Sequence, residues 1–333
     1  MSYDQSIHVI DTHTAGQATR IVVGGMPILR GKTMMEKKEY FKNNLDNIRK
    51  MLMHEPRGHA DMFGAVLTEP TDDRADYGMI FLDGLGCLNM CGHGTIGVAT
   101  ALVETKMVKV TEPVTSIVLE SPAGLIEVDV EVVNGKAKHA TFQNVASFLY
   151  KEDVEVDVPE LGKIHCDISF GGNFFAIVKA EDIQVDIEPE NVRDIIPKAL
   201  SIMKSVNQQV AIQHPTLDIN TVDLVEIYGP AKSDDADNQN VVVLGEGEVD
   251  RSPCGTGTCA KIATLTAKGQ LALNQEFVYE SILRTKFIAK AVEETTVGEY
   301  KAILPRITGS AYITGFNHFV LDPEDPLTYG FTF

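Results

Sequence analysis

Apolar and polar residues alternate along several short segments in the first half of the chain. The alternation is clear in SIHVIDTHTAG (6–16) and ATRIVVGG (18–25), and apolar residues also dominate DMFGAVL (61–67) and YGMIFLDG (77–84). Strands that bury at least one face show such patterns over four to eight residues. These four segments are therefore predicted to be β-strands.

Two further segments of the first half carry distinct local signals. In TMMEKKEYFKNNLDNIRKMLMHE (33–55) the apolar positions recur at helical spacing, which predicts one long surface helix. In GLIEVDVEVVNGKAKHATFQNV (124–145) two alternating runs flank Asn134-Gly135, which is a strong signal for a β-hairpin.

The second half repeats the order of the first. CDISFGGNFFAIVKA (166–180) has the rhythm of residues 10–24, a helical pattern follows at about 189–208, and strand patterns run to GSAYITGFNHFVLD (309–322). The rhythm returns at an offset of 156 residues, and the second of two cysteine-containing helix starts returns at a similar offset of 163. Near-constant offsets indicate two halves of one architecture that arose by duplication.

Composition and charge narrow the class of protein. A chain of 333 residues has the length of two domains of about 150 residues each. The net charge of −18 disfavours nucleic acid and anionic membrane as partners, and no apolar run approaches the roughly 20 residues of a membrane helix. Five cysteines are an odd number that does not suit a secreted disulfide framework, and the N-terminus lacks a signal segment, so a cytoplasmic protein is predicted.

Two stretches place a cysteine directly before a glycine-rich helix start. They are LNMCGHGTIGVATAL (88–102), which contains Cys91, and DRSPCGTGTCAKIATL (250–265), which contains Cys254. The N-terminus of a helix favours an anion, and thiol pKa values there fall to about 3.5–7.5. The glycines remove side chains that would keep a small ligand away from the backbone N–H groups.

Several interpretations of these stretches compete. One interpretation is a buried cysteine beside a glycine turn that serves packing alone. This interpretation could explain one such stretch, but it explains poorly why two occur at matched places of a repeat. A zinc site would use Cys87, Cys91, Cys254 and Cys259, but the C-x3-C and C-x4-C spacings suit it poorly. A redox pair lacks a C-x-x-C motif, and a phosphate loop lacks its lysine. Cys87, Cys166 and Cys259 are predicted to be inert core thiols.

The remaining interpretation is acid–base chemistry at a carbon atom. A base that removes a Cα proton from one face leaves a planar carbanion, and inversion requires a proton delivered to the other face. Two thiols on opposing half-sites meet this need, one starting as thiolate and the other as thiol, with coupled titrations. The chain offers no obvious pyridoxal-phosphate or metal site, so neither a cofactor nor a metal is expected.

Six segments spread over essentially the whole chain together resemble the proline racemase family. They are NMCGHGTIG, VDRSPCGTGT, DTHTAGQATRIVVGG, EPRGHADMFG, FGGNFFA and GSAYITGFNHF. The resemblance implies an α/β (α+β) fold of two similar domains of the diaminopimelate-epimerase type, each with strands wrapped around a central helix. It also implies an active site in the cleft between the domains, a homodimer, and a two-thiol mechanism without pyridoxal phosphate.

The domain boundaries expected for this fold follow the repeat. The first domain is predicted to span residues 1–125, with the C-terminal segment 312–333 returning to it, and the second domain to span 126–311.

The resemblance assigns roles to residues that match the family's motifs. Cys91 and Cys254 match the catalytic pair, and a threonine replaces the second cysteine in the branch that dehydrates 3-hydroxyproline, so Cys254 favours stereoinversion. Asp250 and His93 match the partners of the substrate nitrogen. The positions that hold the substrate carboxylate, largely through backbone N–H groups, are matched by Gly92, His93, Gly255 and Thr256.

The wall that faces the substrate ring is expected to contain Phe63, Leu224 and Leu244. All three are apolar, whereas hydroxyproline epimerases tend to carry polar side chains at some of the equivalent positions. Proline racemases usually have phenylalanine where this chain has Leu244, which implies a roomier pocket. The sequence therefore predicts a racemase acting on the small molecule proline; the alternatives are a 4-hydroxyproline 2-epimerase and a non-catalytic amino-acid- or metal-binding protein.

Overall fold

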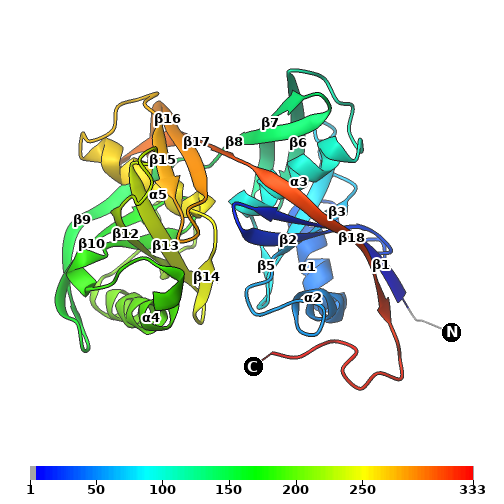
Figure 1. The fold of residues 1–333 in the computed structure, drawn as a ribbon, viewed down its shortest axis with the longest axis horizontal. Coiled ribbons are helices and arrows are strands. Elements are labelled where there is room, and N and C mark those ends of the chain that lie inside the picture. The colour runs from blue at the N-terminus through cyan, green and yellow to red at the C-terminus, as the bar shows by residue number, and fades with distance from the viewer. Residues whose placement is uncertain (1–4, 333) are drawn as a thin grey trace. The chain divides into compact units, whose positions relative to one another are not determined.

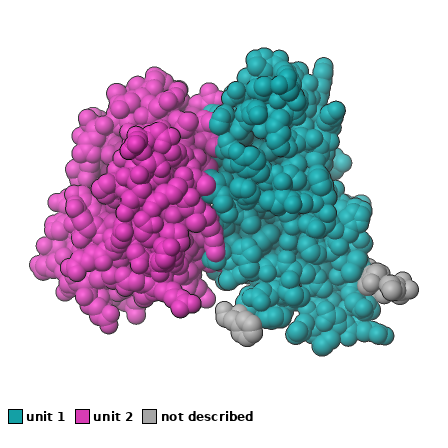
Figure 2. All heavy atoms as spheres, in the orientation of Figure 1, with its two compact units in different colours: residues 1–142, 310–333 teal, residues 143–309 magenta. Residues whose placement is uncertain are grey.

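The computed structural model describes residues 5–332, and the chain folds into two compact units (Figures 1 and 2). The first unit comprises the chain up to Phe142 together with the segment from Ser310 onward, and the second comprises Gln143–Gly309. The boundary predicted from the sequence lies at 125/126. The structure places it later because the strand that starts at Gly124 pairs with the preceding strand of the first unit.

The first unit is rich in strands and contains three helices within its described residues. Its strands lie in the order β18-β1-β2-β3-β4-β6-β7-β8, and β5 pairs with β4. In this order, β2 with β3 and β4 with β6 are parallel pairs, and the other neighbours are antiparallel. The elements are β1 (Gln5–Thr14), β2 (Gln17–Gly24), α1 (Met34–Asn44), α2 (Asp46–Met53), β3 (Gly64–Thr68), β4 (Tyr77–Leu82), β5 (Cys87–Leu88), α3 (Gly92–Glu104), β6 (Val114–Ser121), β7 (Gly124–Val133), β8 (Lys136–Gln143) and β18 (Ala311–Leu321).

The second unit repeats this pairing. In the order β9-β10-β11 the strands are antiparallel, β11 pairs parallel with β12, β12 antiparallel with β13, β13 parallel with β15, and β14 pairs with β13. Because β15-β16-β17 continue antiparallel and β17 pairs with β9, the strands of this unit close on themselves. The elements are β9 (Ser147–Val158), β10 (Gly162–Phe170), β11 (Phe174–Lys179), η1 (Glu181–Ile183), η2 (Pro189–Asn191), α4 (Val192–Gln209), β12 (Val222–Pro230), β13 (Asn238–Leu244), β14 (Glu248–Asp250), α5 (Gly255–Ala267), β15 (Phe277–Glu280), β16 (Lys286–Val297) and β17 (Tyr300–Gly309).

Each unit surrounds one helix with strands, which confirms the predicted architecture. In α3 all residues from Gly92 to Val103 are buried, and the helix contacts β1, β2, β3, β7 and β18. The sequence of α3 consists largely of small residues because the strands approach closely: a Cβ at Gly97 would lie 2.9 Å from Oγ1 of Thr12. The helix α5 has the same place in the second unit, where it contacts β9, β10, β11, β16 and β17.

The predicted hairpin is confirmed, whereas the prediction of one long helix over residues 33–55 is wrong. Asn134 and Gly135 adopt φ values of 53° and 73° between β7 and β8, as a two-residue hairpin turn requires. The segment 33–55 forms two helices rather than one, because Leu45 leaves the helical conformation with φ −132° and packs against the apolar core. The segment also contributes fully buried side chains, such as that of Phe41, so it is not a purely surface element.

Candidate active site

Cys91 occupies the N-cap position of the central helix of the first unit. Its backbone is extended, with φ −147° and ψ 116°, and the next residue begins α3. The carbonyl oxygen of Cys91 accepts hydrogen bonds from the backbone N–H of Thr95 (2.9 Å) and from the Thr95 hydroxyl (2.8 Å). These bonds hold the cysteine at the positive end of the helix dipole, where a thiolate is favoured.

His93 lies directly beside the Cys91 thiol. The sulfur is 3.4 Å from Nδ1 and 3.6 Å from Nε2 of the imidazole, and only 4% of His93 is exposed. The ring of Phe63 meets the imidazole edge-on, with centroids 4.7 Å apart and an interplanar angle of 84°. The hydroxyl of Thr14 donates to the carbonyl of His93 at 2.8 Å, which fixes the first turn of α3 to strand β1. The first unit thus brings Cys91, His93 and Phe63 together.

Cys254 occupies the N-cap of the central helix of the second unit in a strained backbone conformation. Its φ of 62° lies in the region that residues with a side chain seldom adopt, at a cost of about 1–3 kcal/mol. The surrounding hydrogen bonds support this conformation. The N–H of Cys254 donates to Oγ of Ser252 (3.1 Å), and that hydroxyl donates to Oδ1 of Asp250 (2.7 Å). Asp250 is therefore connected to Cys254 through Ser252.

The sulfur of Cys254 faces the first turn of its helix. It accepts a hydrogen bond from the N–H of Gly257 at 3.4 Å and lies 3.6 Å from Oγ1 of Thr256. Burial raises the pKa of the Cys254 thiol well above its usual value, and the charge of Asp250 adds to this rise, while the Gly257 and Thr256 contacts oppose it. At Cys254 the effect of burial therefore outweighs that of the helix N-terminus.

An apolar cluster surrounds the Cys254 side chain. Leu224 and Leu244 are direct cross-strand partners on β12 and β13, and both pack in this cluster. The other buried members are Phe175, Ile177, Val242 and Ala260, and Tyr228 also packs against the cluster. The second unit thus brings together Cys254, Gly255, Thr256, Asp250 and the two leucines.

The thiols of the remaining three cysteines are less acidic than an ordinary cysteine thiol. Burial raises the pKa of Cys87 to about 11 and those of Cys166 and Cys259 to about 12. Within residues 5–332, no three side chains of the His, Cys, Asp or Glu type are grouped in a way that could hold a metal ion. In the same part of the chain, no helix is long and apolar enough to cross a membrane.

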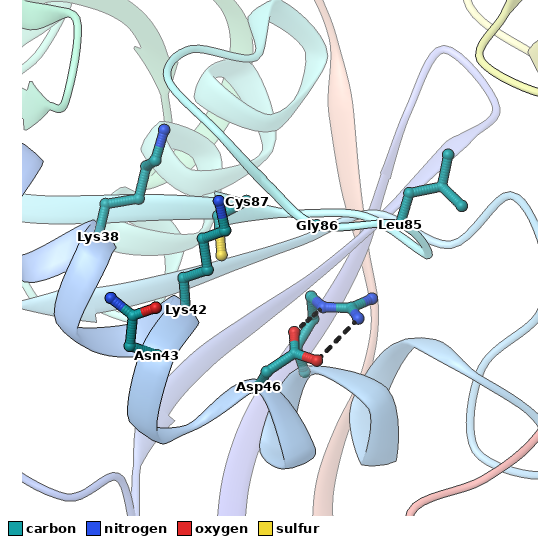
Figure 3. A pocket seen from close by; sticks show the side chains of 8 residues that line it. Lys38, Lys42, Asn43, Asp46, Leu85, Gly86 and Cys87 are labelled. Carbon is teal, nitrogen blue, oxygen red and sulfur yellow. Dashed lines mark hydrogen bonds and ion pairs between the residues drawn. The ribbon is translucent and has the colours of Figure 1, made fainter.

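A surface cavity of about 440 Å³ in the first unit lies between α1, α2 and residues 85–87 (Figure 3). Arg49, one of its lining residues, is bonded to Asp46 and to the carbonyl oxygens of Asp83 and Gly84. None of the predicted site residues lines this cavity, so its location does not support a role in the chemistry assigned to Cys91.

Sequence reasoning missed two residues that position the site. Thr14 is separated from His93 by 79 residues, so no local pattern connects them. Ser252 lies inside the DRSPC motif, two residues before Cys254, and this spacing is typical of a hydroxyl that accepts from a nearby backbone N–H.

Comparisons with known proteins identify relatives over the whole chain. Residues 9–332 match the family model described as "Proline racemase". A proline racemase of Clostridioides difficile is 58% identical over 332 residues, which cover 99% of each chain. A proline racemase of Acetoanaerobium sticklandii is 56% identical over 335 residues, which cover 100% of each chain. The crystal structure of a hydroxyproline epimerase from Agrobacterium vitis, with bound trans-4-hydroxy-L-proline, superposes with a TM-score of 0.90 at 30% identity and covers 100% of this chain and 97% of that one.

Proposed function

Because the chain belongs to the proline racemase family, we propose that it interconverts L- and D-proline by moving the Cα proton between the thiols of Cys91 and Cys254. The observation that carries the proposal is the matched position of the two cysteines. Each directly precedes a buried helix that starts with glycine, and each helix is the centre of a unit with the same strand pairing. Substrate and product of a racemase are mirror images, so two equivalent acid–base groups are what the reaction needs.

The reaction consists of two proton transfers at one carbon atom. One cysteine, as thiolate, takes the Cα proton: the C–H bond breaks, an S–H bond forms, and the electron pair remains on a planar Cα conjugated with the carboxylate. The other cysteine, as thiol, delivers its proton to the opposite face, and its own electron pair stays on sulfur. The enzyme ends with the roles of the two sulfurs exchanged, ready for the reverse direction.

Binding of the carboxylate would stabilise the carbanion. Backbone N–H groups of Gly92, His93, Gly255 and Thr256 belong to the first turns of α3 and α5, where the helix dipole favours negative charge. Charge that develops on the carboxylate in the transition state gains most from such fixed donors. Asp250 would receive the substrate ammonium, since its Oδ1 is held in place by Ser252.

The apolar neighbours of the thiols support proline as the substrate. Leu224 and Leu244 pack around Cys254, and Phe63 packs against His93, so the three side chains proposed for the ring wall are apolar and cannot themselves bond a substrate hydroxyl. The second candidate is a 4-hydroxyproline 2-epimerase, which one observation favours: a structural relative 30% identical to this chain was solved with trans-4-hydroxy-L-proline bound.

The family resemblance extends the proposal to the enzyme's requirements and assembly. We expect activity without an added cofactor, as a homodimer in the cytoplasm. Size-exclusion chromatography with light scattering tests the dimer, and exhaustive dialysis against a chelator followed by assay tests the independence from metal.

Polarimetry of the purified protein tests the proposed function. L-proline without added cofactor is expected to lose its optical rotation completely, and in D₂O the D-proline formed is expected to carry deuterium at Cα, because the thiol protons exchange with solvent. Trans-4-hydroxy-L-proline is the matched substrate in a parallel reaction. Unchanged rotation with both amino acids would contradict the proposal, and faster turnover of hydroxyproline would support the epimerase instead.

A further inference from the structure

A network of polar residues is buried behind the Cys254 thiol. Glu226 on β12 is completely buried, and its Oε1 accepts a hydrogen bond of 2.6 Å from the hydroxyl of Tyr279, which is also completely buried. Asn240 on β13 donates from Nδ2 to the carbonyl of Pro253, the residue directly before Cys254. The mechanism proposed above uses neither this carboxyl group nor its partners.

The carboxyl group of Glu226 lies close to the sulfur of Cys254. A Cβ atom at Gly257 would be 2.6 Å from Oε2 of Glu226 and 3.3 Å from the Cys254 sulfur. The oxygen and the sulfur are therefore separated by no more than the total of these two distances, about 5.9 Å. In a buried setting, a neighbouring charge at about 4–6 Å shifts the pKa of an ionisable group by about one unit or more.

A lysine completes the network from the central helix. Lys261 lies one turn after Gly257 on α5, is 2% exposed, and holds its Nζ 2.9 Å from the centre of the Tyr228 ring. Burial raises the pKa of Glu226, and the charge of Lys261 opposes that rise; burial lowers the pKa of Lys261, and the charge of Glu226 opposes that fall. Glu226 and Lys261 are therefore two buried ionisable groups, each of which favours the charged form of the other.

The first unit serves as an internal reference, because its pairing matches that of the second. Ile21 pairs with Ala65 as Ile177 pairs with Glu226, so Ala65 takes the place of Glu226. Under the helix start, a Cβ at Gly94 would meet the ring of Phe81 at 2.7 Å, where a Cβ at Gly257 would meet the carboxyl of Glu226.

The rest of the network is also replaced by apolar residues. Tyr77 pairs with Leu119 as Asn238 pairs with Tyr279, which makes Leu119 the counterpart of Tyr279. Counted from its cysteine, Val98 is the counterpart of Lys261. The support behind Cys91 is therefore apolar, and the support behind Cys254 is polar and ionisable.

We propose that Glu226 is a positioning residue that keeps the proton on Cys254, so that Cys254 is the acid and Cys91 the thiolate in the resting enzyme. This inference rests on the proposed function for its meaning. A carboxylate within about 5.9 Å of the sulfur opposes a thiolate there and offsets the positive end of α5. In the first unit the place of Glu226 is taken by Ala65, whose cross-strand partner Phe81 packs under the start of α3.

Other charged groups contribute to both sides of this balance. The charge of Asp250 on β14 acts on Cys254 in the same direction as Glu226. The pKa of Lys261 also responds to Asp167 on β10, which favours its charged form. Lys179 on β11 and Lys268 at the C-cap of α5 disfavour that form. Because these groups are unchanged in a Glu226→Gln variant, that substitution isolates the effect of the carboxylate.

The pH dependence of thiol alkylation tests the proposal, because iodoacetamide reacts with the thiolate. Each sulfur is measured alone by mass spectrometry, Cys254 in a Cys91→Ser background and Cys91 in a Cys254→Ser background. Glu226→Gln is expected to lower the pH midpoint for labelling of Cys254 by about one unit and to leave the midpoint for Cys91 unchanged. Differences in accessibility change the rate at its plateau, not the midpoint.

Two further variants keep the test decisive. Tyr279→Phe removes the hydroxyl that helps Glu226 to ionise, so it is expected to shift Cys254 in the same direction by less; it stands in if Glu226→Gln does not fold. Lys261→Met is expected not to lower the Cys254 midpoint. Equal midpoints for Cys254 with and without Glu226→Gln, or equal shifts of both cysteines, would overturn the proposal. The readout needs no turnover, so it is independent of the polarimetric test of the proposed function.

Discussion

Gly257→Ala adds one methyl group at the tightest point of the Cys254 half-site. The new Cβ would lie 2.6 Å from Oε2 of Glu226 and 3.3 Å from the sulfur of Cys254. Contacts under 3.0 Å force a shift, and the carboxyl group has little freedom to give way because it is completely buried and its other oxygen is bonded to Tyr279. The first turn of α5 is therefore expected to move instead.

Two quantities are expected to change in Gly257→Ala: the free energy of unfolding, to which two effects contribute in opposite directions, and kcat. Overpacking of a buried site costs about 1–3 kcal/mol, and replacing a helical glycine by alanine returns about 1 kcal/mol, so the net destabilisation is about 0–2 kcal/mol. The N–H of Gly257 donates to the Cys254 sulfur, and a hydrogen bond to a charged group contributes about 1.5–3 kcal/mol. Its misalignment is expected to lower kcat roughly 10- to 150-fold.

Urea denaturation and polarimetry measure these two effects on the same preparation. Gly86→Ala is the matched control, because no heavy atom lies within 4 Å of the added Cβ, and it is expected to behave as the parent. A Gly257→Ala protein that retains more than half of the parental kcat would refute the reasoning, since the helix start would then not be held against Glu226.

Four further outcomes are expected. Cys91→Ser and Cys254→Ser each lower kcat by about 10²–10⁴-fold with an unchanged circular dichroism spectrum; more than a tenth of the parental rate removes that residue from the mechanism. Iodoacetamide inactivates the enzyme, planar pyrrole-2-carboxylate protects it, and mass spectrometry finds the label on Cys91 or Cys254; first labelling of another cysteine without loss of activity contradicts this. Proline is preferred over 4-hydroxyproline in kcat/KM by roughly 5–150-fold, because Leu224 and Leu244 leave a hydroxyl unpaired at about 1–3 kcal/mol; a reversed ratio identifies an epimerase. Burial raises the pKa of Glu226 from 4.5 to about 7, so the contribution of its protonated form to stability is present below pH 4.5 and is lost as pH rises through 7. Between pH 5 and pH 8 the Glu226→Gln variant should therefore lose less resistance to urea than the parent does. An identical loss in both proteins would contradict the pKa shift.

Much of the fold could be predicted from local pattern, because strands such as β7 alternate between buried and exposed residues and the hairpin turn is chemically specific. The break at Leu45 could not, since the apolar spacing continues through it and only packing against the core shows why the helix ends there. The end of the first compact unit at Phe142 is not apparent from the sequence for a similar reason. Residues 126–142 belong to the first unit because β7 pairs with β6, and pairing partners do not follow from alternation within one strand.

Local motifs located the candidate site residues but not their supports. Cys91 and Cys254 lie at helix starts because glycine and small residues follow each of them, and this signal is contained in a few consecutive positions. Thr14 binds the carbonyl of His93 across 79 residues, which no consecutive pattern contains. The acidity of Cys254 also depends on burial, which the helix-start motif does not encode.

The sequence around Glu226 already indicates a buried acid. In VDLVEIYG, alternation places Glu226 on the same face of the strand as Val222 and Leu224, both of which are buried, so the pattern already indicates an acid that points into the core. A buried acid requires a partner, and Lys261 lies on the face of α5 that carries Gly257. The counterparts in the first half, Ala65 and Val98, are apolar. The two units share one strand pairing but differ in having an acid and a base behind only one of the two cysteines. A costly polar core is thus retained on one side only, and this is the physical reason to look for inequivalent protonation of the two thiols.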